Sequence, residues 1–253
     1  MPAQTINEII DRLESITRES VVTGNQLGIF AQVYLGVTKL VKAGIREGRF
    51  DDGPRMERLD VIFANRYLDA YDQFQKKQRC THAWQTAFEG AARPGLAILQ
   101  HLFLGMNAHI NLDLGIAAAE TVAPEELPSL RADFYQINQL LTEQIEQMKR
   151  QVHKVSPLLF LLDWSGTKRD EKFAAFSLKK ARAHAWIVAQ RLSKLSPKEK
   201  ETAISELDEY VNVLNRLITG PGIFFSFFIR IVHWFEEKDV KTIIASLDMS
   251  LTE

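Results

Sequence analysis

The chain has 253 residues, of which 46% are hydrophobic, a formal net charge of −1 and a single cysteine. This length suffices for a substantial core, and the near-neutral charge provides no overall field that would attract nucleic acid, so we expect no nucleic-acid partner. Cys80 has no partner for an intrachain disulfide and the N-terminus lacks a secretory pattern, so we expect a reducing, cytoplasmic location.

Hydrophobic residues recur at helical spacing along the first part of the chain. The pattern over Ile6–Ile16 predicts an amphipathic helix, and similar patterns predict helices over about 25–44 and around 59–70. We expect Pro94 to open a central helix that continues to about residue 120. Pro128 lies near the start of the helix that follows.

The second half of the chain continues in the same way. We expect a helix over about 171–195, and Ser196 and Pro197 then serve as the N-cap and first-turn proline of the next helix. The Gly-Pro-Gly sequence at 220–222 separates that helix from a final apolar helix and a short tail helix. Two further breaks, at 48–54 and 164–170, have the composition of loops.

Strand signals are almost absent, because no Asn-Gly or Asp-Gly hairpin lies between alternating apolar residues. We therefore predict an all-α fold in which residues 1–253 form a single-domain bundle of about eight to ten helices. We also expect no transmembrane segment, since no apolar stretch approaches the roughly 20 residues that span a bilayer.

The central segment LQHLFLGMNAHINLDLGIAAAE combines an almost wholly apolar helix with polar side chains. These side chains are His101, Asn107, His109, Asn111 and Asp113. Burying such a group without a partner costs about 1–3 kcal/mol. The central helix therefore needs polar partners, water in a cavity or a bound ligand.

Helical spacing decides which of these side chains can act together. His101 and Asp113 lie roughly 18 Å apart along the axis, too far to share a metal ion. His109 and Asp113 are separated by only one turn, roughly 6 Å, and can converge on one ion. A metal centre would need at least one or two further ligands from other helices. The structural alternative is a core pair in which His109 donates to Asp113.

Three other residues of the central helix add to the candidate site. Asn107 and Asn111 form a second pair, one turn apart on a neighbouring face, and are candidate ligand-binding residues. Gly105 weakens a helix by about 1 kcal/mol relative to alanine, which predicts the close approach of another backbone or of a ligand.

Charged residues on other helices supply further candidates. Arg66 falls on the apolar stripe of its helix, so it either reaches the surface or pairs with an anionic ligand or a carboxylate, such as Asp60, Asp113 or Asp133. Asp133 itself is a candidate ligand-binding residue or an N-terminal helix charge. Arg182 is a further candidate, although it shares a face with a tryptophan four residues on and has stacking as its structural alternative.

The segment GIFFSFFIRIVHWF is strongly apolar but too short to span a bilayer. It is typical of a buried C-terminal helix, and the alternatives are the wall of an apolar ligand cavity or a face that touches a membrane surface. The chain has no GxSxG elbow, no GxxxxGK[ST] phosphate loop, no CxxC pair and no HExxH motif.

Five segments together resemble a mainly bacterial family identified as domain of unknown function five-nine-nine-five. The segments are NQLGIFAQVYLGVT, RMERLDVIFANRYLDAY, LQHLFLGMNAHINLDLGIAAA, DFYQIN and KKARAHAW. This resemblance covers nearly the whole chain and implies a helical domain without indicating an activity. His109 and Asp113 also match the His-x3-Asp unit of helical zinc-dependent phospholipase C and single-strand nuclease proteins. This sequence departs from that pattern, because no histidine follows within Gly115–Ala119.

The first functional hypothesis is a cytosolic metal-dependent hydrolase that acts on an anionic or lipid-like small molecule. His109 and Asp113 would hold zinc, iron or manganese, which would polarise the substrate or activate water. Arg66 would neutralise an anionic group of the substrate, and His101 would serve as an acid or base farther along the cavity.

Two alternatives stay open. One is a metal-free helical pocket that binds or isomerises an apolar or isoprenoid ligand, with Asn107, His109 and Arg66 orienting it. The other is a non-catalytic interaction module with a structural polar core. The sequence predicts no particular oligomeric state.

Overall fold

The first three helices follow one another through short connections. They are α1 (Ile6–Thr23), α2 (Leu27–Arg46) and α3 (Gly53–Gln75). The Thr5 side chain caps α1 by accepting from the backbone of Glu8, and Gly24 ends that helix with a φ of 70°. Asp52 caps α3 in the same way, accepting from the backbone N–H of Arg55 at 2.9 Å. Local capping therefore marks the start of α1 and of α3 and the end of α1.

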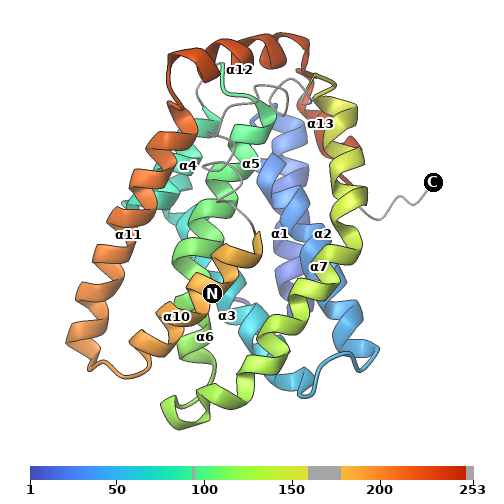
Figure 1. Cartoon of the computed structure of the whole chain (residues 1–253). Coiled ribbons are helices and arrows are strands. Elements are labelled where there is room, and N and C mark those ends of the chain that lie inside the picture. Colours follow the sequence, from blue (N-terminus) through green and yellow to red (C-terminus); the bar gives the residue numbers. More distant parts are fainter. Residues whose placement is uncertain (93–94, 159–177, 249–253) are drawn as a thin grey trace.

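The computed structural model describes residues 1–92, 95–158 and 178–248, and Figure 1 shows them as a bundle of helices. The remaining helices are α4 (His82–Ala91), α5 (Ile98–Met106), α6 (Leu114–Thr121), α7 (Leu127–Val155), α10 (Leu178–Leu192), α11 (Pro197–Thr219), α12 (Ile223–Phe235) and α13 (Val240–Ser246). No strand occurs in the described ranges, so the predicted all-α, single helical domain is confirmed. Pro94, the predicted loop at 164–170 and the predicted helix start near 171 lie outside the described residues.

The periodicity predicted one continuous α-helix over the central segment, but the structure departs from this prediction. Between α5 and α6 the segment Asn107–Asp113 forms a π-helix, and the Leu114 N–H donates to the His109 carbonyl five residues earlier. A π-helix is rare and is frequently found at functional sites. The wider turn changes the spacing of the polar side chains in this segment, so α-helical spacing no longer applies there.

The central helix also corrects the expectation that no segment of the chain is long and apolar enough to span a membrane. The helix Ile98–Thr121 has 24 residues. An 18-residue stretch of it has a mean hydropathy of 1.2, and 83% of that stretch is buried inside the bundle. No transmembrane span is confirmed. The segment is apolar because other helices surround it, as in the core helix of a helical bundle.

The final apolar helix, α12, crosses one end of the bundle (Figure 1). Phe225 and Ile229 are buried against Ala97 at the start of α5. Its other face is open, since Phe227 and Trp234 are 61% and 81% exposed. The helix is therefore only partly buried and exposes apolar side chains, whereas the sequence favoured a fully buried one.

Glycines allow close packing around the central helix. A Cβ atom at Gly115 would lie 2.8 Å from the carbonyl oxygen of Ala185, so this glycine allows the backbone of α10 to approach α6. A Cβ atom at Gly105 would lie 2.5 Å from the ring of Phe30 on α2. The close approach predicted at Gly105 is thus made by an aromatic side chain.

Candidate functional site

A cavity of about 430 Å³ lies between α2, α3, the central helix, α7 and α10. Its apolar lining includes Phe30, Val33, Val37, Val41, Met56, Leu59, Phe63, Phe103, Met106, Ile110, Leu114, Ile137, Leu141, Met148 and Leu178. Its polar lining consists of Tyr34, Asp60, His109, Asn138, Lys179 and Arg182. A volume of roughly 300–1,000 Å³ and a mainly apolar lining with a few polar groups are typical of small-molecule sites.

His109 projects from the π-helical segment into this cavity. Its ring stacks on Phe63 with centroids 3.6 Å apart and meets the edge of Tyr34 at 4.3 Å. Neither ring nitrogen has a hydrogen-bond partner among the described residues. Burial lowers the pKa of His109 and outweighs the opposing effect of Asp113, so the ring is neutral. A neutral imidazole offers one donor and one acceptor to a molecule in the cavity.

Asp113 lies behind His109 and is only 1% exposed. Its Oδ1 atom accepts from Arg66 Nε at 2.9 Å, and its Oδ2 atom accepts from Trp84 Nε1 at 2.7 Å. The distance from His109 Nδ1 to Asp113 Oδ2 is 3.6 Å, which is longer than a hydrogen bond. Of the three carboxylates proposed as partners of Arg66, the structure selects Asp113.

The hypothesis that His109 and Asp113 hold a metal ion can be compared with the contacts of these two residues. Both carboxylate oxygens of Asp113 already accept hydrogen bonds, one of them from the cationic Arg66. Within the described residues, no group of three or more His, Cys, Asp or Glu is arranged to hold a metal ion. His109 and Asp113 therefore do not form a donor set that fits a zinc centre, which needs at least three protein ligands.

Two polar residues of the cavity were not recognised as site residues from the sequence. Asp60 is 7% exposed, its Oδ2 atom has no hydrogen-bond partner among the described residues, and burial together with the nearby Glu57 raises its pKa to about 7. Within the same part of the chain the Tyr34 hydroxyl also lacks a hydrogen-bond partner, and burial raises its pKa. The available signal was that each lies among apolar residues on the buried face of its helix.

Arg182 reaches the cavity from the first turns of α10 and is 4% exposed. Its Nη2 atom donates to the carbonyl oxygen of Phe134 at 2.7 Å, and its guanidinium carbon lies 4.8 Å from the centre of that residue's ring. Its Nε atom has no hydrogen-bond partner in the part of the chain that the structure describes. Arg182 thus stacks on a residue of α7, whereas the sequence suggested a tryptophan on its own helix.

Asn107 and Asn111 face α11 and do not line the cavity. Asn107 Nδ2 donates to the carbonyl oxygen of Val211 and to Asn215 Oδ1, both at 2.9 Å. Asn111 Nδ2 donates to Asn107 Oδ1 at 2.8 Å. Asn215 in turn donates to the Ala83 carbonyl at 2.9 Å. These amides form a buried network that joins the central helix to α11 and α4.

His101 does not share the cavity with His109. It lines a separate void of about 20 Å³ next to Gly105 and Trp84. Burial lowers its pKa to about 4, with a further contribution from His233, and neither ring nitrogen has a partner among the described residues. The proposed acid or base is therefore neutral and lies apart from the larger cavity.

Asp133 organises a loop. Its carboxylate accepts from the backbone N–H groups of Asp51 and Asp52 at 2.7 and 3.1 Å and from Arg55 Nη2 at 2.6 Å. These contacts attach the α2–α3 connection to α7. All of them are internal, and Asp133 is not among the residues that line the cavity.

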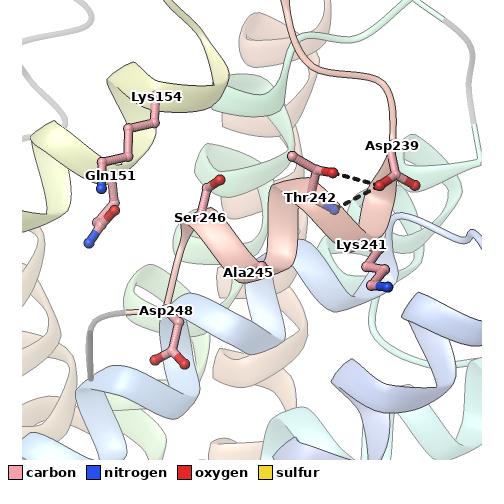
Figure 2. Close-up of a pocket in the computed structure, with 8 residues that line it drawn as sticks. All are labelled: Gln151, Lys154, Asp239, Lys241, Thr242, Ala245, Ser246 and Asp248. Atoms are coloured by element: carbon pink, nitrogen blue, oxygen red, sulfur yellow. Dashed lines mark hydrogen bonds between the residues drawn. The ribbon is translucent and has the colours of Figure 1, made fainter.

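A second depression, of about 480 Å³, lies between the end of α7 and α13 (Figure 2). Its side chains are mainly polar, and several lie on the surface, including Lys154 and Lys241. Asp239 accepts from the backbone and hydroxyl of Thr242 and so caps α13. Among the residues that line this depression, only Gln151 has a buried side-chain atom, Oε1, without a hydrogen-bond partner among the described residues. The depression is therefore a weaker site candidate than the apolar cavity that His109 faces.

Comparison with known proteins gives one match. The family model described as "Family of unknown function (DUF5995)" matches residues 6–221, and this bears out the first resemblance found in the sequence. No curated protein and no solved structure matches the chain.

Proposed function

We propose that this chain, which belongs to the family of unknown function DUF5995, binds an elongated, mainly apolar small molecule in the cavity between α2, α3, the central helix, α7 and α10. The observation that carries this proposal is the neutral, buried His109, whose two ring nitrogens have no hydrogen-bond partner among the described residues and which faces a mainly apolar cavity. No metal is required.

The lining favours an apolar ligand. Aliphatic, thioether and aromatic side chains from five elements meet in the cavity, and each square ångström of apolar ligand surface removed from water contributes about 25 cal/mol. Exposed Lys179 belongs to the same lining, so the cavity extends to the surface beside the start of α10. A ligand has an entry path there.

The unpartnered groups favour a ligand that also carries an oxygen atom. A buried donor or acceptor left unsatisfied costs about 1–3 kcal/mol. His109, Asp60 and Tyr34 each place such an atom in the cavity. A hydroxyl or carbonyl group on the ligand would give at least one of them a partner and would fix the orientation of the ligand.

These contacts favour the metal-free pocket over the two other hypotheses. The metal-dependent hydrolase needs further ligands beside His109 and Asp113, and the described residues place no third His, Cys, Asp or Glu with them. The interaction module needs a polar core whose members are paired with one another. That description suits Asn107 and Asn111, whereas the ring nitrogens of His109 in the cavity have no hydrogen-bond partner among the described residues.

Binding of dodecan-1-ol, measured by displacement of a fluorescent apolar probe, tests the proposal. We expect saturable binding that Leu59→Trp abolishes, because Leu59 lines the cavity and the indole would fill it. The matched control is Leu217→Trp on α11, where the residue is 54% exposed and the same substitution should leave binding unchanged. Absence of saturable binding, or equal loss in both variants, would contradict the proposal.

Metal analysis of protein purified without an affinity tag separates this proposal from the hydrolase. We expect zinc, iron and manganese well below one equivalent. A stoichiometric metal that disappears in His109→Ala would instead favour the hydrolase.

The cytoplasmic location of the protein stays a prediction. Cys80 is buried and carries a free thiol.

A second function, proton transfer on the bound molecule, is favoured by the position of His109. Its ring lies beside the carboxylate of Asp113, with 3.6 Å between Nδ1 and Oδ2, and catalytic hydrogen bonds are often long before substrate binds. Incubating methyl decyl ketone with the protein in D2O tests this function. We expect faster deuterium incorporation next to the carbonyl with wild type than with His109→Gln; equal rates would exclude it.

A further inference from the structure

We propose that the molecule bound in this cavity is an anionic amphiphile whose carboxylate pairs with Arg182 at the α10 end of the cavity. This inference rests on the proposed function, because it requires that the cavity binds a ligand. Beyond the proposed function, the inference specifies that the ligand is negatively charged and that its charged end lies at Arg182. The apolar tail would extend from Arg182 towards the side chains that α2, α3 and the central helix contribute.

The first observation is that Arg182 carries a buried charge without a carboxylate partner among the described residues. The side chain is 4% exposed and donates from Nη2 to the carbonyl oxygen of Phe134, over whose ring it lies. Among the described residues no Asp or Glu forms an ion pair with it, and its Nε atom is unpartnered. A carbonyl oxygen and an aromatic ring compensate a guanidinium charge only in part.

The second observation is that the acidic side chain in the cavity does not provide the missing charge. Asp60 lines the same cavity from α3 but forms no ion pair with Arg182 within the part of the chain that is described. Burial raises the pKa of Asp60 to about 7, which holds much of it in the neutral form near neutral pH. The cavity therefore has an excess of positive charge at its α10 end.

The third observation concerns the chemistry that this end would select. Lys179 lies one turn before Arg182 and also lines the cavity, but it is exposed. Its charge can attract an anion to the entrance, while the buried guanidinium supplies the fixed, planar donors that match a carboxylate. A long-chain carboxylate combines that group with a tail suited to the apolar lining.

Comparing dodecanoate with dodecan-1-ol at pH 6, both below their aggregation concentrations, tests the inference, because Asp60 stays mainly protonated at this pH while the fatty acid is ionised. The two probes share the chain length and differ in the charged end. We expect wild type to bind dodecanoate roughly tenfold or more tightly than the alcohol, as a charge-assisted hydrogen bond in a buried site requires. Arg182→Met should remove this preference and leave binding of the alcohol nearly unchanged.

Two further variants complete the test. Lys180→Met is the matched control, because it removes one positive charge from an exposed position of α10 that does not line the cavity, where screening makes the charge weak. It should keep most of the preference. Arg182→Lys keeps the charge and loses the planar donors, so we expect an intermediate preference. Arg182→Lys also tests the inference if Arg182→Met does not fold.

The outcomes separate the inference from the proposed function. Equal binding of acid and alcohol by wild type, or a preference that survives in Arg182→Met, would overturn the inference and leave the cavity as an apolar site. If neither probe binds, the proposed function fails as well. Preference for dodecyl phosphate over dodecanoate by tenfold or more would overturn the assignment of a carboxylate.

Discussion

Arg66 donates from Nε to Oδ1 of Asp113 at 2.9 Å, and this ion pair joins the middle of α3 to the π-helical segment of the central helix. The Asp113 side chain is 1% exposed, whereas that of Arg66 is 24% exposed. The pair gives the buried aspartate of the apolar central helix a cationic partner. Because Asp113 also accepts from Trp84, its carboxylate connects three helices.

Replacing Asp113 by Asn should destabilise the protein by about 3 kcal/mol, because it leaves Arg66 without its anion and alters the acceptor for Trp84. Urea denaturation measures the change. The control is Asp72→Asn, which breaks the more exposed ion pair with Arg12 and should cost about 0–1 kcal/mol. Equal losses in the two variants would show that burial of Asp113 adds nothing.

Gly105→Ala should destabilise the protein by about 1–2 kcal/mol, although alanine favours a helix by about 1 kcal/mol. The new Cβ atom would lie 2.5 Å from the Phe30 ring, so the ring must move. The check is a double-mutant cycle with Phe30→Leu, monitored by thermal unfolding. A coupling energy of about 1 kcal/mol or more is expected; additive effects would contradict the proposed clash.

Asp133→Asn should loosen the connection between α2 and α3. The substitution places an amide where the carboxylate accepts from two backbone N–H groups and Arg55, and we expect a loss of about 3 kcal/mol. Hydrogen exchange should become faster at the amides of Asp51 and Asp52. Asp51→Asn changes the same side chain at an exposed neighbouring position and should stay within about 0.5 kcal/mol of wild type.

Asp60 should make the folded state less stable as the pH rises. Its pKa is about 7 in the folded protein, against an ordinary value near 4, so between these values the unfolded chain has released a proton that the folded chain keeps. The contribution of this group to the unfolding free energy then falls by about 1.4 kcal/mol per pH unit over that window.

Comparing Asp60→Asn with wild type isolates this effect from other titrating groups. The variant should gain roughly 2–3 kcal/mol relative to wild type between pH 5 and pH 7, because asparagine has no proton to lose. Chemical denaturation at the two pH values measures the difference. A difference between the two proteins that does not change with pH would contradict the raised pKa of Asp60.

Much of the fold could be predicted from the sequence, because helical periodicity is a local property. The pattern of apolar residues placed α1, α2, α3, α7 and α11, and the capping residues of α11 marked its start. The polar residues of the central helix were also recognised as buried groups that need partners. Their identity as candidates followed from residue type and from the apolar surroundings alone.

The sequence by itself thus determined where most of the helices lie and which residues they bury, since these depend on residues within a few turns of one another. It did not predict the π-helical segment of the central helix or the open face of α12. Tertiary structure decided which polar groups are paired. Asn107 meets α11, Asp113 meets Arg66 and Trp84, and His109 is left facing a cavity. These contacts join residues far apart in the chain, and small changes in the approach of two helices, such as those that Gly105 and Gly115 permit, decide which atoms come within hydrogen-bond distance.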